Sequence, residues 1–245
     1  MRRTETFTSW SGFTTGNHTS LTIDLPSGTI EVRSVDTASL TVHLDTDQPA
    51  DWDISQFGDT VSVRAPRRRG LRLRSAKLFV EAPTGTHLDI NAASADITLS
   101  GTLGEVRVRS ASGDLRAGTL DRLDASMASG DIRVGTVHGR LTASTASGDI
   151  RADRVGDDLE VGTASGDVRI DCCDGNSIDA KSVSGDMQLG LPAGIRVEPD
   201  ISTMSGRTTL PKPTASSPTV ELRRTVRVRL RSVSGDITIE RVTPR

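Results

Sequence analysis

Ala146-Ser147-Gly148-Asp149-Ile150-Arg151 is the stretch that decides the fold, because close variants of it recur along the chain. Aligned on their central residue, the copies are Ser94-Ala95-Asp96, Ser112-Gly113-Asp114, Ser129-Gly130-Asp131, Ser147-Gly148-Asp149, Ser165-Gly166-Asp167, Ser184-Gly185-Asp186, Ser205-Gly206-Arg207 and Ser234-Gly235-Asp236. Successive copies are 18, 17, 18, 18, 19, 21 and 29 residues apart. A nearly constant step that lengthens late is typical of a stacked repeat with loops inserted near one end.

Apolar residues alternate with polar ones on both sides of the repeat glycine. They occupy positions +2 and +4, as Ile150 and Ala152 do, and positions −7 and −5, as Leu141 and Ala143 do. A side-chain period of two then predicts that positions −2, 0, +2 and +4 face inward, with the glycine itself against the core. The odd step from −5 to −2 predicts a corner. Two strands and two corners per repeat predict an all-β fold, a flattened single-chain β-solenoid of about 18-residue coils.

The two ends of the chain differ from the repeat. Residues 1–75 alternate as strands do but carry no repeat, so we expect an N-terminal β meander that caps the solenoid. Residues 76–245 are expected to hold the repeats, with a proline-rich insertion near 211–218. Arg241 and Pro244 follow the last copy and should blunt that end. We therefore expect a monomer or small oligomer rather than a filament.

Composition excludes several functional classes. The formal net charge of −2 argues against a general nucleic-acid binder. Aromatic residues are only 2% of the chain and Tyr is absent, so the core must consist of aliphatic side chains. No apolar run reaches the length of a signal peptide or a membrane span, and a cytoplasmic location is expected.

Motifs for catalysis, cofactors or metals are missing from the sequence. Cys172 and Cys173 are adjacent and alone, so they suit neither a disulfide framework nor a zinc site, and we expect a bulge at a corner there. The four histidines show no metal-ligand spacing, and no nucleophile elbow, P-loop or dinucleotide fingerprint occurs. The sequence therefore predicts no catalytic residue, no metal and no cofactor.

Aspartates at position +1 form the most regular polar feature. With the glycines they make a repeat ladder of Gly113, Asp114, Gly130, Asp131, Gly148, Asp149, Gly166, Asp167, Gly185, Asp186, Gly235 and Asp236. A stacked row of carboxylates could bind calcium or a sugar. Arginines at +3, which include Arg133 and Arg151, lie on the same face and would neutralise the row. We favour this structural interpretation over a metal or ligand site.

Arginines also follow the outward positions of the strand before the last copy. They are Arg223, Arg227, Arg229 and Arg231. Such a stripe is a candidate contact surface for an anionic partner, because guanidinium groups bind phosphates and carboxylates. A solvated strand face is the alternative. No aromatic residues alternate with these arginines, which argues against a platform for single-stranded nucleic acid.

The reiterated Ala-Ser-Gly-Asp-Ile/Val-Arg motif, as in Ala128 to Arg133, resembles the bacterial putative-adhesin family of β-strand-repeat proteins, a group with a domain of unknown function. The resemblance covers roughly residues 20 to 240 and implies a right-handed, β-helix-like solenoid. It implies no catalytic residue. We expect a non-catalytic scaffold or binding module for an unknown protein or glycan partner. The alternatives are a carbohydrate-active β-helix protein and a binder of an anionic partner through the arginine face.

Overall fold

The computed structural model describes residues 1–7, 19–66, 75–211 and 224–242. This part of the chain forms two compact units, Met1–Gly130 and Asp131–Arg245. Its elements are β1 (Arg2–Phe7), β2 (Ser20–Val35), β3 (Leu40–Asp45), the 3-10 helix η1 (Pro49–Asp51), β4 (Asp53–Phe57), β5 (Thr60–Arg64), β6 (Ala76–Pro83), β7 (His87–Ser112), β8 (Leu115–Ser129), β9 (Ile132–Val137), β10 (Leu141–Ser147), β11 (Ile150–Val155), β12 (Leu159–Ser165), β13 (Val168–Cys173), β14 (Ser177–Ser184), β15 (Met187–Pro192), β16 (Arg196–Ser205), β17 (Thr208–Thr209), β18 (Thr225–Ser234) and β19 (Ile237–Val242). The fold is all-β, as the sequence predicts.

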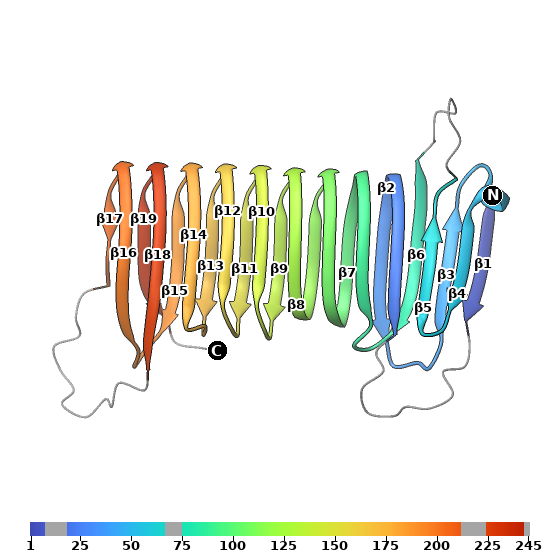
Figure 1. The fold of residues 1–245 in the computed structure, drawn as a ribbon, viewed down its shortest axis with the longest axis horizontal. Helices are drawn as coiled ribbons and strands as arrows, with labels where there is room; N and C mark the ends of the chain where they lie inside the picture. The colour runs from blue at the N-terminus through green and yellow to red at the C-terminus, as the bar shows by residue number, and fades with distance from the viewer. Residues whose placement is uncertain (8–18, 67–74, 212–223, 243–245) are drawn as a thin grey trace. The chain divides into compact units, whose positions relative to one another are not determined.

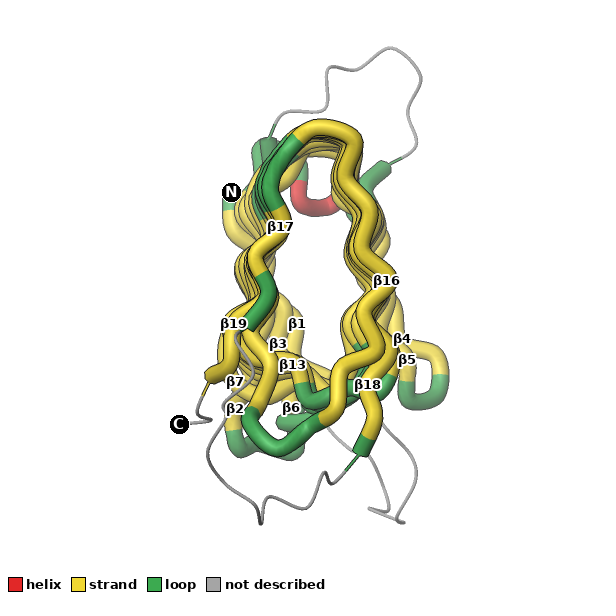
Figure 2. The backbone as a smooth tube through the Cα atoms, turned by 90° about the vertical axis from the view of Figure 1, so that its left-hand side faces the viewer, coloured by secondary structure: helices red, strands yellow, loops and turns green. Residues whose placement is uncertain are grey.

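The second unit is a stack of parallel two-stranded coils, as the repeat predicts (Figure 1). β10, β12 and β14 pair in parallel along one side, and β9, β11, β13 and β15 pair in parallel along the other. Viewed along the coils, β16 and β18 lie on one long side and β17 and β19 on the other (Figure 2). The Ser-Gly-Asp turn is the corner that joins the two sides. Equivalent residues of successive coils are therefore direct neighbours.

Aliphatic side chains fill the space between the two sides of each coil. In β12, Leu159 and Val161 are buried, and so is Thr163 at position −3. Ala164 at position −2 is exposed. The hydroxyl of Thr163 donates to the carbonyl oxygen of Gly148 at 3.2 Å. The buried hydroxyl therefore has a hydrogen-bond partner beside the corner.

The prediction that position −2 faces inward is wrong, because the buried residue before the corner is the one at position −3. Strict alternation continues from −7 through −5 to −3, and the chain turns only after −3. The exposed −2 residues are Ala111, Ala128, Ala146, Ala164, Val183, Met204 and Val233. Positions +2 and +4 are buried as predicted, for example Ile150 and Ala152.

The repeat glycines lie against neighbouring backbone rather than against the core. Gly166 has φ +141°, a conformation that side chains with a Cβ rarely adopt, and an added Cβ would lie 2.1 Å from the carbonyl oxygen of Gly148. Gly185 repeats the arrangement with the carbonyl oxygen of Gly166 at the same distance. The expectation of a glycine packed on the core is therefore wrong. Close stacking of two corners requires the glycine.

The last coil in sequence is not the last coil in space. β14 pairs with β18, and β18 pairs on its other side with β16. β19 likewise lies between β15 and β17 (Figure 1). Coil 225–242 is thus placed between coil 177–192 and coil 196–209. Arg241 does not blunt an end, because its guanidinium donates to the carbonyl oxygens of Pro192 and Ile195 at 2.9 Å each.

The first unit combines parallel coils with antiparallel strands. β2 pairs in parallel with β7 on one side and with β5 and β6 on the other, and β7 pairs in parallel with β8. β1 with β3, β3 with β6, and β4 with β5 are antiparallel pairs. β2 is therefore a complete parallel coil within the expected meander. Gly28 of this coil aligns with Ala95 and has φ +139°, so Ser27-Gly28-Thr29 is a further copy of the repeat.

Some expectations about domains stay predictions. The division into a cap over residues 1–75 and repeats over 76–245, the capping itself and the right-handed winding are among them. The proline-rich insertion near 211–218 lies almost wholly outside the described residues, as does Pro244.

Candidate functional site

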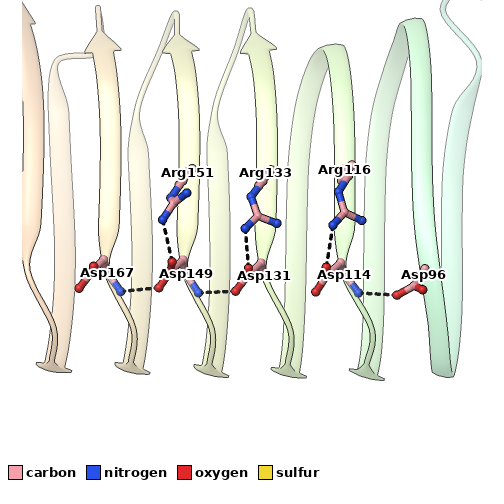
Figure 3. A network of polar contacts seen from close by, with 8 residues as sticks. All are labelled: Asp96, Asp114, Arg116, Asp131, Arg133, Asp149, Arg151 and Asp167. Atoms are coloured by element: carbon pink, nitrogen blue, oxygen red, sulfur yellow. Dashed lines mark hydrogen bonds and ion pairs between the residues drawn. The ribbon is translucent and has the colours of Figure 1, made fainter.

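The repeat aspartates form a continuous hydrogen-bonded row in the second unit. Each carboxylate accepts the backbone N–H at position +1 of the next coil in space. The donor–acceptor pairs are Asp149 to Asp131 (2.9 Å), Asp167 to Asp149 (2.9 Å), Asp186 to Asp167 (2.9 Å), Asp236 to Asp186 (2.8 Å) and Arg207 to Asp236 (2.7 Å). In the first unit, Asp114 donates to Asp96 at 3.1 Å. Figure 3 shows the contact between Asp96 and Asp114 in the first unit and those among Asp131, Asp149 and Asp167 in the second.

The second oxygen of several of these carboxylates faces an arginine of its own coil. Asp131 contacts Arg133 at 2.7 Å, and Asp149 contacts Arg151 at 2.9 Å (Figure 3). Asp114 pairs with Arg116 at 2.8 Å in the same way. These are the pairs that the spacing of +1 and +3 predicts. The next coil departs from the pattern, because Arg169 contacts Asp171 at 2.8 Å instead.

The hydrogen bonds have an electrostatic consequence at Asp131. The backbone N–H of Asp149 lowers the pKa of the Asp131 carboxyl below its ordinary value, and Arg133 and Arg151 add to this effect, while partial burial opposes it. The carboxylate form is therefore the one that the coil stack stabilises. The aspartates hold neighbouring coils together through this form.

The row ends in space where the motif changes. Coil 196–209 is the outermost of the second unit among the described residues, and it carries Arg207 where the inner coils carry aspartate. A carboxylate at that position would meet no N–H from a further described coil. In the described part of the second unit, the copy that has arginine in place of aspartate, Ser205-Gly206-Arg207, therefore lies where a carboxylate would have no N–H to accept.

The contacts of the repeat aspartates join neighbouring coils and leave fewer oxygen lone pairs for a ligand. One backbone N–H is accepted by each of the carboxylates of Asp96, Asp131, Asp149, Asp167, Asp186 and Asp236. Asp114, Asp131 and Asp149 also contact an arginine. Among the described residues, no group of three or more histidine, cysteine or acidic side chains is arranged to hold a metal ion. The contacts show that the ladder joins neighbouring coils, and its exclusion as a metal or ligand site stays a prediction.

The candidate arginine stripe lies on the outward face of β18, except for Arg223, which is outside the described residues. Arg229 lies between two carboxylates of neighbouring strands, 3.2 Å from Asp200 and 3.6 Å from Asp179. Arg231 is 3.9 Å from Asp200. Arg227 lines an open hollow whose other residues include Asp158 and Glu198. The stripe is therefore a mixed-charge surface.

The two cysteines end strand β13 and are buried. Burial raises the pKa of both thiols, that of Cys173 to about 12. Both residues keep the parallel register, Cys172 with Arg154 and Cys173 with Val155, so the expected bulge is absent from this strand. The extra residue of the 19-residue step lies in the following turn, since Ile178 pairs with Leu159.

A groove that the sequence analysis missed crosses the outward face of β1, β3, β6 and β2 in the first unit. It encloses about 580 Å³. Half-buried His43 and Phe79 form its floor, with ring centroids 5.7 Å apart and planes inclined by 30°. Glu31, Lys77 and Asp45 lie around them. Local alternation marks these positions as outward, but only the antiparallel pairing of β3 with β6 brings the two rings together.

A family model matches nearly the whole chain, including all the repeats. The model of the Toastrack DUF4097 family matches residues 18–240. The chain belongs to this family. The family carries a domain of unknown function, in agreement with the resemblance seen in the sequence.

Solved structures support the same Toastrack fold. A putative adhesin from Bacteroides fragilis has a TM-score of 0.58 with 15% identity, over 98% of this chain and 97% of that one. A putative lipid binding protein from Parabacteroides distasonis has a TM-score of 0.57 with 17% identity, over 98% and 96%. No curated protein matches the sequence. In the described ranges, no helix is long and apolar enough to cross a membrane.

Proposed function

We propose that this Toastrack protein is a non-catalytic scaffold or binding module, with an unknown protein or glycan partner. The observation that carries the proposal is the use of the periodic polar residues. Asp149 shows it best, because one oxygen accepts the N–H of the next coil and the other contacts Arg151. A carboxylate whose two oxygens serve a backbone N–H and an arginine is suited to holding coils together more than to acting as an acid, a base or a metal ligand. The names of the adhesin-like relatives agree with a binding role.

The test combines capture with a search for turnover. Purified protein is immobilised, retained partners from the native cell extract are identified by mass spectrometry, and the free protein is incubated with a broad panel of polysaccharides. We expect retained partners and no cleavage. Cleavage that Asp149→Asn or Asp167→Asn abolishes would instead establish the carbohydrate-active alternative.

A binder of anionic partners through β18 receives less support. Arg229 lies between Asp179 and Asp200, which reduces its attraction for an external anion. Such a function requires affinity for nucleic acid or acidic glycan that falls with salt and with the double change Arg227→Ala and Arg229→Ala. Affinity that is the same at low and moderate salt would eliminate it.

We also propose that the protein is a monomer or small oligomer in solution, rather than a filament, and that it is cytoplasmic. Coil 196–209 supports the proposal that the protein does not polymerise. Pro199 on its edge strand β16 has no N–H to offer another strand, and Arg207 stands where the inner coils carry the ladder carboxylate. Light scattering over a concentration series should give a constant mass. Long unbranched filaments in electron micrographs of the same samples would contradict it. Fractionation of the native cells tests the location.

A further inference from the structure

The geometry points to the groove over β1, β3, β6 and β2 as a binding site for a neutral saccharide. This inference rests on the proposed binding function and names a ligand class for it. Its basis is an aromatic floor in a surface groove whose rim carries hydrogen-bonding side chains of both charges. We define the saccharide groove by Thr4, Glu31, His43, Asp45, Lys77 and Phe79.

Strand register assembles the groove in two neighbouring rows. One row runs from Thr4 through His43 and Phe79 to Glu31, each residue opposite the next. The row beside it contains Asp45 opposite Lys77. Adjacent strands are about 4.8 Å apart, so the four strands together span about 14 Å, which is long enough for a short oligosaccharide. All these positions face outward, because the residues between them, such as Leu44 and Leu78, are buried.

The two rings of the floor do not serve the core. The core of the unit is filled from the opposite face of the same strands by residues such as Leu78 and Val80. Phe79 nevertheless presents its ring outward and stacks beside His43. Thr4 Oγ1 and His43 Nδ1 share a hydrogen bond of 3.0 Å, which fixes the plane of the imidazole. The floor is thus a preformed, partly apolar surface, as ligand sites commonly are.

The rim matches the hydroxyl groups of a sugar. Glu31, opposite Phe79 on β2, supplies acceptors, and Lys77, two residues before Phe79 on β6, supplies donors. Asp45 supplies further acceptors. A pyranose has an apolar C–H face and a periphery of hydroxyls that both donate and accept. Its face can lie on the Phe79 ring while its hydroxyls reach the carboxylates and the ammonium group. A purely apolar ligand cannot make both kinds of contact.

Charge favours a neutral ligand over an anionic one. Glu31 and Asp45 balance the cationic Lys77 and Arg2 on the groove. Asp45 also lies 3.5 Å from Arg2 and 3.7 Å from the N-terminal ammonium group, so these cations already have a counter-charge. A phosphate or uronate would therefore gain little attraction there.

The test uses the full chain and an array of neutral and uronic-acid-containing oligosaccharides, followed by calorimetric titration of any trisaccharide that binds. We expect binding of at least one neutral oligosaccharide. Phe79→Ala should weaken it at least tenfold, and Glu31→Gln at least threefold. Phe57→Ala is the matched control, because that phenylalanine is 92% exposed on β4, outside the groove, and its removal should leave affinity unchanged.

Each other result overturns the inference. No binding to any sugar on the array, binding only to the uronic-acid sugars, or neutral-sugar binding that neither Phe79→Ala nor Glu31→Gln weakens would do so. Thermal unfolding of each variant shows whether it is folded, and Glu31→Gln keeps the test valid if Phe79→Ala is not. If partners from the cell extract are still retained while sugars are not, the groove fails and the binding function stands. If neither is retained, both fail.

Discussion

The carboxylate of Asp149 accepts the backbone N–H of Asp167 at 2.9 Å, although 18 residues separate the two. Its other oxygen contacts Arg151. Asp149→Ala removes both contacts and should lower the free energy of unfolding by about 1–2 kcal/mol, the usual range for a lost side-chain cap or charged hydrogen bond. Asp149→Asn keeps one acceptor oxygen and should cost less than half as much. Urea unfolding measures both. Equal and negligible losses would mean that the carboxylates do not hold the coils together.

Gly166 should tolerate no side chain. Its φ of +141° and the 2.1 Å approach of an added Cβ to the carbonyl oxygen of Gly148 predict that Gly166→Ala costs about 2 kcal/mol or more. Gly162 is the matched control, because its nearest neighbour in that direction is 3.9 Å away and its φ is ordinary. Gly162→Ala should be neutral or slightly stabilising. Equal effects of the two changes on the unfolding free energy would show that the corner geometry is not what requires the glycine.

Stability should depend on pH through Asp131. Its pKa is lowered in the folded state, mainly by the N–H of Asp149, so the stabilisation is present above the ordinary pKa of 3.8 and is lost as the pH falls through the folded value. Asp131→Asn should therefore destabilise the protein near pH 6, and the difference from the wild type should shrink below about pH 4. Chemical unfolding at a series of pH values measures it. A difference that grows on acidification would have the wrong sign.

Cys173 should be chemically silent in the folded protein. Burial raises its pKa to about 12, so almost no thiolate is present at pH 8. Labelling with a chromogenic disulfide reagent should be slow in buffer and rapid in denaturant. The single variants Cys172→Ser and Cys173→Ser show which of the two thiols reacts. Fast labelling of folded Cys172→Ser protein would show that Cys173 is accessible and activated.

Asp236 tests the spatial order of the last coils. Its carboxylate accepts the N–H of Arg207 at 2.7 Å because coil 196–209 stacks outside coil 225–242. Asp236→Ala should therefore cost about 1–2 kcal/mol, like an internal ladder residue. Arg207→Ala should change stability by less than about 0.5 kcal/mol, as an exposed substitution usually does. The reverse result would place coil 225–242 at the end of the unit.

The sequence by itself determined the coil and its main chemistry. Burial of Ile150 and Ala152 and the contact between Asp149 and Arg151 follow from spacing alone, because side chains alternate along a strand and coils of constant length put equal positions side by side. The sequence could not place the corner correctly. A threonine at −3, such as Thr163, reads as an outward polar residue until its hydrogen bond to the neighbouring corner is seen.

Only the tertiary structure decided the order of the coils and the composition of the groove. Nothing local to residues 196–242 indicates that β18 inserts between β14 and β16, because that order depends on pairing between segments far apart in the chain. His43 and Phe79 are likewise 36 positions apart, and they meet only because β3 runs antiparallel to β6. A repeat pattern records which side of a strand faces inward. The choice of neighbouring strand depends on long-range contacts, which a linear period does not contain.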